Sequence, residues 1–270
     1  MMTVVDVKKT RRWAWWQVTE YRLVQISKWW TSVLLFGVGN PVLYLFSIGL
    51  GVGALVQANS GGAGVDGVPY LTFLAPALLA TAAIQGAQDE ATFPVVHGFV
   101  WGKNFYSINS TPTTGTDIAN GVMAVAVIRT FVTTGLYAIV LVLFNATTLE
   151  RVIPMYFVAC IAALCYASVM LAASAFVKID GNFFEIIQRL IIMPMFMFSG
   201  TFFPLENMPI YLQVFGWISP LWHATNLGRA ISYGHEIPSW LLIVHIFYLG
   251  AMAVVGLKIA YRQFSKRLEQ

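Results

Sequence analysis

The stretch Asn182–Gly234, NFFEIIQRLIIMPMFMFSGTFFPLENMPIYLQVFGWISPLWHATNLGRAISYG, decides the fold of this 270-residue chain. Its first part, Ile186–Phe203, is long and apolar enough to cross a bilayer as a helix. Prolines then interrupt a segment that stays aromatic, and each removes a backbone donor and disfavours helical geometry before it. Broken backbone survives at membrane depth only where protein or a wet cavity covers its polar groups. We therefore expect residues 203–234 to form a re-entrant helical pair in the outer leaflet, with an ordinary extracellular loop as the alternative.

The composition of the whole chain is that of a membrane protein. Hydrophobic residues make up 58% and charged residues only 10%, with a mean hydropathy of +0.70, whereas a soluble domain of this size carries about 25% charged residues. Five further apolar runs are long enough to span a bilayer: Val33–Val56, Tyr70–Gln88, Ile118–Phe144, Ile153–Val177 and Trp240–Ile259. We expect an all-α, polytopic membrane protein with six transmembrane helices.

The distribution of lysine and arginine predicts the orientation of these spans. If both termini are cytoplasmic, the inner segments hold twelve Lys or Arg, and the outer segments hold only Arg151 and Arg229. Residues 1–31 are basic and rich in tryptophan, which favours an interfacial amphipathic helix with Trp13 and Trp16 on its apolar side, although a flexible basic tail is the alternative. Residues 32–270 then form the six-span domain of a multi-pass protein of the cell (inner or plasma) membrane.

The order of residues in the opening stretch resembles the signature region of the type-2 ABC exporter permeases. The residues that carry the likeness are Arg189, Pro194, Ser199-Gly200, Phe203-Pro204, Met208-Pro209, Gln213 and Pro220-Leu221. Residues 39–53 and 70–93 are similar to the same family, within which the chain is most similar to permeases for lipo-oligosaccharide nodulation factors and for drugs. The resemblance implies a second permease half, identical or homologous, and two cytoplasmic ABC ATPase subunits that bind ATP and magnesium.

The resemblance also gives the link between spans two and three a role. In these exporters the link is cytoplasmic and carries a coupling helix that rests in a cleft of the ATPase, which places this region at about residues 93–117. Aromatic and basic side chains suited to such docking are Phe99, Trp101, Lys103, Phe105 and Tyr106. A simple turn on the membrane face is the alternative.

Charged residues near the cytoplasmic ends of the spans suggest a network inside the membrane. Arg129 lies within the third span, where a bare guanidinium costs about 2.5–3.5 kcal/mol, so it should face protein or water and find a partner. Asp89 and Glu90 on span two, or Glu185 on span five, could pair with it. Glu185 and Arg189 are four residues apart and share one helical face. Snorkelling of Arg129 to the interface is the alternative.

Motifs for chemistry on this chain are absent from the sequence. The segment Gly98–Lys103 resembles a phosphate-binding loop but is one residue short and lacks the final Ser or Thr. The four histidines and two cysteines have no metal-ligand spacing, and no nucleophile elbow occurs. We expect no catalytic residue, metal or cofactor on this chain, and an ATPase partner that performs hydrolysis.

The sequence therefore predicts a permease that exports an amphiphilic cargo such as a lipo-oligosaccharide or another glycolipid. Efflux of a drug or other hydrophobic compound is the alternative, and an ATP-independent carrier or channel is less favoured because no inverted repeat or midplane charge pattern is evident. Aromatic residues and prolines of the opening stretch are expected to line the outer gate and cargo path: Phe202, Phe203, Pro204, Pro209, Tyr211, Phe215, Trp217 and Pro220.

Overall fold

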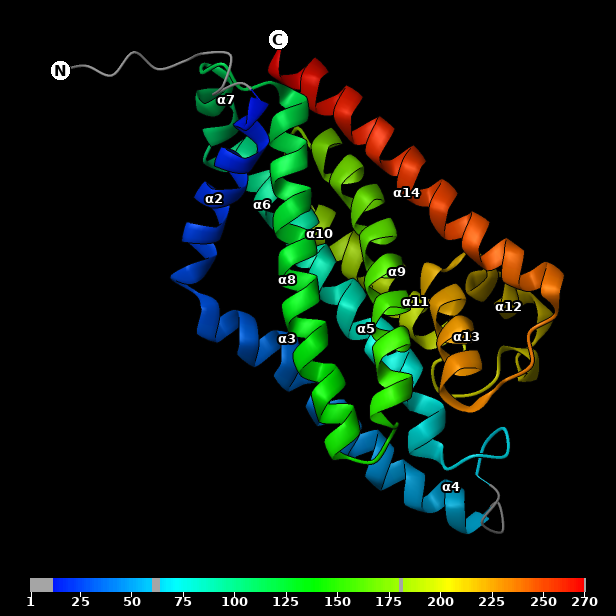
Figure 1. Ribbon diagram of the computed structural model, residues 1–270. Helices are drawn as coiled ribbons and strands as arrows, with labels where there is room; N and C mark the ends of the chain where they lie inside the picture. Colours follow the sequence, from blue (N-terminus) through cyan, green and yellow to red (C-terminus); the bar gives the residue numbers. More distant parts are fainter. Residues whose placement is uncertain (1–11, 60–63, 180–181, 270) are drawn as a thin grey trace.

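The computed structural model describes residues 12–59, 64–179 and 182–269, and every regular element in this part is helical (Figure 1). The first eleven residues of the expected interfacial segment lie outside the described residues. In chain order the helices are α2 (Ala14–Ser27), α3 (Trp30–Tyr44), the π-helical η1 (Leu45–Val52), α4 (Gly53–Asn59), α5 (Tyr70–Ala91), α6 (Phe93–Val96), η2 (His97–Trp101), α7 (Asn104–Asn109), α8 (Gly115–Leu143), α9 (Leu149–Phe176), α10 (Phe183–Ile186), η3 (Ile187–Ile192), α11 (Met193–Phe198), η4 (Leu205–Asn207), α12 (Ile210–Ile218), α13 (Pro220–Tyr233) and α14 (Ser239–Leu268).

Five helical segments of the described chain are long and apolar enough to cross a membrane. They are Trp30–Val56, Tyr70–Trp101, Gly115–Leu143, Leu149–Phe176 and Ser239–Leu268. Each overlaps one of the spans expected from hydropathy. The prediction of an all-helical, polytopic membrane protein is therefore confirmed.

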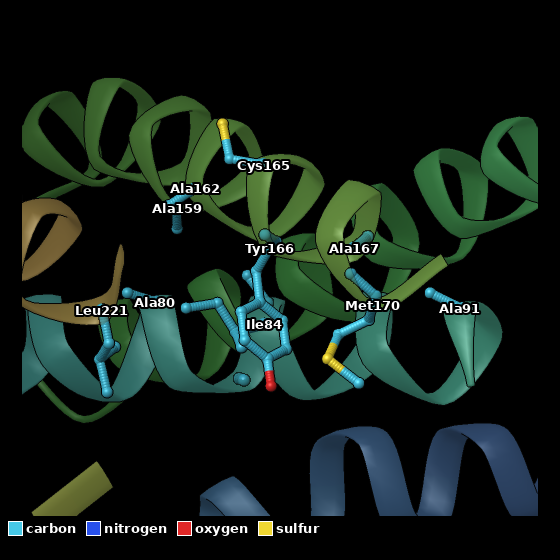
Figure 2. Packing of buried hydrophobic residues seen from close by; sticks show 14 of the residues in the cluster. Ala80, Ile84, Ala91, Ala159, Ala162, Cys165, Tyr166, Ala167, Met170 and Leu221 are labelled. Atoms are coloured by element: carbon cyan, nitrogen blue, oxygen red, sulfur yellow. The ribbon is translucent and has the colours of Figure 1, made fainter. Parts of the chain in front are cut away.

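Helix α5 lies at the centre of the bundle and packs against α8, α9 and α13, while α14 runs along α9 (Figure 1). Small residues bring these helices close together, as Figure 2 shows for Ala80 of α5 and Ala159 and Ala162 of α9. A Cβ atom added to Gly256 of α14 would lie 2.4 Å from the hydroxyl of Ser168 on α9. Close backbone approach of this kind is typical of membrane helices, where packing rather than water drives association.

Helix α2 packs against α8 through a face of small and polar residues. Ala14, Val18 and Arg22 are buried, and a Cβ atom on Gly121 of α8 would meet Val18 at 2.6 Å. Trp13, on the side that the sequence suggested as apolar, stays exposed. The helix is therefore attached to the bundle by one face and leaves its indole-bearing face free.

The fifth apolar run forms a shorter helix than the sequence predicts. It is helical over the 16 residues Phe183–Phe198, which corresponds to about 24 Å at 1.5 Å per residue. The helix ends at Phe198 and the chain leaves helical geometry at Ser199, followed by Gly200 with a φ of +72°. The predicted end of this helix at Phe203 is therefore wrong. The π-helical turns of η3 end at Ile192, two residues before Pro194. The missing N–H of this proline disturbs regular α-helical bonding.

Two short helices, α12 and α13, follow this break. Ser219 caps α13 by accepting a hydrogen bond from the backbone N–H of Leu221 at 3.1 Å, and Pro220 occupies the first turn, where it fits a helix best. Gly234 ends α13 with a φ of +80°. Helix α13 is largely buried against α5 and α9, whereas most of α12 is exposed.

Candidate functional site

A polar cavity of about 670 Å³ opens between α5, α8 and the helix Phe183–Phe198. All five members of the expected charge network line it: Asp89, Glu90, Arg129, Glu185 and Arg189. Amide side chains from α5 and η3 (Gln85, Gln88 and Gln188) and two aromatic rings (Phe93 and Phe184) complete much of its wall. The structure therefore brings residues from three separate segments to one place.

Arg129 is paired with both acidic residues of α5. Its Nη1 donates to Oε1 of Glu90 at 2.7 Å, and its Nη2 donates to Oδ2 of Asp89 at 2.9 Å. Gln85 Nε2 also donates to the Asp89 carboxylate at 3.0 Å. Of the three partners that the sequence offered for Arg129, these two are used and Glu185 is not.

Glu90 has a second arginine partner that the sequence analysis missed. Arg22 of α2 donates from Nη2 to Oε2 of Glu90 at 2.9 Å, and the Glu90 side chain is only 3% exposed. One buried carboxylate thus joins α2, α5 and α8. A signal was present in the sequence, because Ala14, Val18 and Arg22 are spaced by four and share one helical face.

A second cavity of about 420 Å³ adjoins the first and lies between α3, α5 and the helix Phe183–Phe198. Gln85, Asp89 and Gln188 line both cavities. The remaining wall of the second cavity is mostly apolar and aromatic, and includes Phe36, Tyr44, Leu78, Ile192, Met193 and Phe196. A cavity lined mainly by charged and amide residues therefore adjoins one lined mainly by apolar residues along the same helices.

The expected docking residues fall into two groups, of which Phe99 and Phe105 form the buried one. Their side chains are 2% and 1% exposed, and both pack on Phe264 of α14, with ring centroids 4.9 and 5.9 Å away. They attach the segment to the bundle and present no surface to a partner. Trp101 and Tyr106, by contrast, are 40% and 37% exposed. Lys103 is also exposed, at a left-handed φ of +51°.

The expected gate residues likewise divide between the interior and the surface. Pro220 is buried, so the structure does not place it on an exposed wall, and Phe202 is half-buried against Phe196 with ring centroids 5.1 Å apart. The exposed members are Phe203, Pro209, Tyr211, Phe215 and Trp217, and Pro204 is intermediate. Three of the exposed members lie on α12, which forms the outer surface of this region.

Arg229 of α13 is a buried cation to which the sequence analysis gave no contact. Its Nη2 donates to the carbonyl of Gly200 at 2.6 Å, and its guanidinium lies 3.8 Å from the ring centroid of Phe73. It thereby links α13 to α5 and to the break after α11. Nearby, Nδ1 of His223 and Nδ1 of His245 are 2.6 Å apart, which joins α13 to α14.

Long apolar helices around a charged cavity place this chain in the class of integral membrane transport proteins. The chain belongs to the ABC-2 type transporter family, whose sequence model matches residues 14–233. It is thus the membrane subunit of an ABC transporter, as the likeness of its signature stretch predicts. Across the residues that the structure describes, no group of three or more His, Cys, Asp or Glu side chains could hold a metal ion.

Several curated relatives span almost the whole chain. Nodulation protein J of Rhizobium leguminosarum bv. viciae is 28% identical over 235 residues, which is 87% of each chain. Nodulation protein J of Rhizobium meliloti (strain 1021) is 26% identical over 256 residues, or 95% of this chain and 94% of the relative. The protein of the same name from Bradyrhizobium diazoefficiens is 24% identical over 235 residues, covering 87% and 86%. No solved structure matches the chain significantly.

Proposed function

We propose that this chain is the permease subunit of an ATP-driven exporter that moves an amphiphile with a sugar headgroup, such as a lipo-oligosaccharide or another glycolipid, from the cytoplasmic side outward. The observation that carries the proposal is the pair of adjoining cavities beside α5 and the helix Phe183–Phe198, one lined mainly by charged and amide residues and one lined mainly by apolar residues. A cargo with two chemically different ends matches two compartments of different polarity.

The polar compartment offers groups that suit sugar hydroxyls. Gln85, Gln88 and Gln188 provide amide donors and acceptors, and the carboxylate of Asp89 is part-exposed beside them. The apolar compartment offers rings and aliphatic side chains, including Phe36, Tyr44 and Phe196, which suit an acyl chain. The resemblance of the signature stretch to permeases for lipo-oligosaccharides suggests a cargo of this kind, and the relatives named nodulation protein J are compatible with it.

The assembly that we propose has six spans, with Phe183–Phe198 as the fifth and both termini cytoplasmic. Figure 1 supports this topology, because the start of α2, α7 and the end of α14 lie at the same end of the bundle. A second half, identical or homologous, completes the path, and α3 exposes a large apolar face that includes Leu35, Phe36 and Leu43. Two ATPase subunits, which hold ATP and magnesium, dock on Trp101, Lys103 and Tyr106.

We further propose that α12 and α13 form the re-entrant pair and the outer gate. Burial of α13 against α5 and α9 supports shelter of the broken backbone from lipid. Contacts of Arg229 with Gly200 and Phe73 hold the pair against the bundle. Tyr211, Phe215 and Trp217 on the exposed face of α12 are available for the cargo path or for the interface region of the bilayer.

Transport by the purified chain with its ATPase in proteoliposomes tests this proposal. We expect a lipo-oligosaccharide to stimulate ATP hydrolysis and to cross the bilayer only with hydrolysable ATP. Gln188→Leu removes a polar group shared by both cavities without breaking an ion pair, so it should lower lipo-oligosaccharide transport severalfold. Gln17→Leu, on the exposed face of α2, is the matched control and should leave transport unchanged.

The outcomes distinguish the competing functions. Equal stimulation by a lipid without its sugar, together with an unaffected Gln188→Leu variant, would favour drug efflux through the apolar cavity alone. Transport that continues without ATP would show an ATP-independent carrier or channel and would refute the exporter.

A further inference from the structure

A basic cleft of about 1070 Å³ lies apart from the cavities described above, at the end of the bundle that holds α7 and the C-terminus of α14 (Figure 1). Four cationic residues line it: Lys103, Lys178, Lys266 and Arg267. They come from the link between η2 and α7, the turn after α9 and the last turns of α14. Among the lining residues that the structure describes, none is Asp or Glu.

The cations in the basic cleft are not equivalent. Arg267 donates from Nη1 to the carbonyls of Ala175 and Val177, at 2.9 and 2.5 Å, and therefore caps the end of α9. Lys178 and Lys266 are exposed, and neither forms an ion pair with any described residue. No described carboxylate is paired with either ammonium group, and both can bind an anion that comes from outside the chain.

Apolar side chains lie directly beside these lysines. Phe176, the last residue of α9, is 55% exposed, and Ile179 is 84% exposed. Both line the basic cleft, whose wall also includes Trp101 and Lys103, which we assign above to ATPase docking. Lysines and exposed apolar side chains at the end of a membrane helix are typical of the interface between the hydrocarbon core and the headgroups.

We infer that the basic cleft binds the headgroup of an anionic phospholipid from the surrounding leaflet. The phosphate lies between Lys178 and Lys266, and an acyl chain extends along Phe176 and Ile179. Basic pockets between transmembrane helices bind acidic lipid headgroups by the same combination of charge and apolar contact. The exposed apolar residues favour lipid over an acidic protein surface, which would leave Ile179 without an apolar partner.

Native mass spectrometry of the full-length chain in a neutral detergent, titrated with phosphatidylglycerol or phosphatidylcholine, tests the inference. We expect phosphatidylglycerol to bind more tightly than phosphatidylcholine. Each lysine near an anionic headgroup contributes about a fivefold change in affinity, so Lys178→Gln with Lys266→Gln should weaken phosphatidylglycerol binding roughly 25-fold. Lys178→Arg with Lys266→Arg should keep most of the binding.

A matched double variant controls for net charge. Lys258→Gln with Arg262→Gln removes two exposed cations of α14 that do not line the basic cleft, and it should leave the affinity within about twofold. Equal binding of the two lipids, or an equal loss in the two neutralised variants, would overturn the inference. Unchanged lipid binding with loss of a co-purifying ATPase from the cleft variant would assign the cleft to the ATPase and also overturn it. All four positions are exposed, so the variants should fold, and the melting temperature checks this.

Discussion

Glu90→Gln removes the buried carboxylate that joins three helices, and we expect it to be the most damaging single change in the charged cavity. Glu90 accepts hydrogen bonds from Arg22 at 2.9 Å and from Arg129 at 2.7 Å, with its side chain 3% exposed. Each hydrogen bond to a charged group contributes about 1.5–3 kcal/mol. A glutamine keeps one acceptor but turns an N–H₂ group toward the second guanidinium. The expected loss is about 3–5 kcal/mol, as for other broken buried ion pairs.

Thermal unfolding of the purified chain measures this loss, which corresponds to a fall in Tm of roughly 10 °C. Asp89→Asn is the matched control, because the Asp89 side chain is 39% exposed. Its loss should stay near 1 kcal/mol, since solvent screens the pair and Glu90 still neutralises Arg129. Equal losses in the two variants would refute the view that Glu90 is the centre of the network.

A charge exchange gives a sharper form of the same test. If Arg129 were the only partner of Glu90, Glu90→Arg combined with Arg129→Glu would partly restore the pair. The structure predicts no recovery, because the new guanidinium would face Arg22, which contacts Glu90 at 2.9 Å in the native chain. Adding Arg22→Glu should then recover part of the lost folded yield, measured by size-exclusion chromatography. Recovery by the exchange without the Arg22 change would show that Arg22 does not share this carboxylate.

Three further predictions concern packing and coupling. Phe105→Ala should destabilise the chain by about 3–5 kcal/mol because it empties a buried aromatic site. Tyr106→Ala should leave Tm nearly unchanged and uncouple ATP hydrolysis from export. Unchanged export in the Tyr106→Ala variant would count against docking. Arg229→Gln should lose about 1.5–3 kcal/mol with its hydrogen bond to a backbone carbonyl, and an unaltered Tm would show that this contact is dispensable. Gly121→Ala should push α2 away from α8 and lower the free energy of unfolding by about 1–3 kcal/mol. Gly250→Ala is the control and should not lower Tm, because a Cβ atom there meets nothing within 4 Å. Equal effects of the two variants on Tm would contradict this packing.

The spans could be predicted from the sequence because apolar length alone decides them. In the first span, a Cβ atom added to Gly49 would lie 2.5 Å from Leu71 of α5, so the two helices pack closely there. The fifth run was harder, because hydropathy continues through Ser199 and Gly200 although the helix ends at Phe198. A positive φ at Gly200 stops the helix, and a hydropathy window does not detect backbone geometry.

The link between spans two and three shows why the sequence pattern did not distinguish rings that dock on a partner from rings that pack on the chain itself. An aromatic, amphipathic stretch suits a groove on a partner and a groove on its own chain equally well. Phe99 and Phe105 are covered by Phe264, which lies more than 150 positions later in the sequence. Since that pairing depends on how α14 crosses the bundle, the sequence of the segment itself does not determine which of its rings are exposed.

The ion pairs of the charged cavity could be predicted only in part, because one of them also depends on a contact between distant segments. Asp89, Glu90 and Arg129 could be grouped because a charge within a span must find a partner, and few candidates share its depth. Arg22 belongs to the basic segment 1–31, for which the sequence predicts an interfacial helix, and a basic residue of such a helix needs no partner. Its burial follows from the close approach of Val18 to Gly121, which carries the guanidinium to Glu90. Because Gly121 has no side chain, α2 approaches α8 closely enough for Arg22 to pair with the buried Glu90 instead of facing the lipid headgroups.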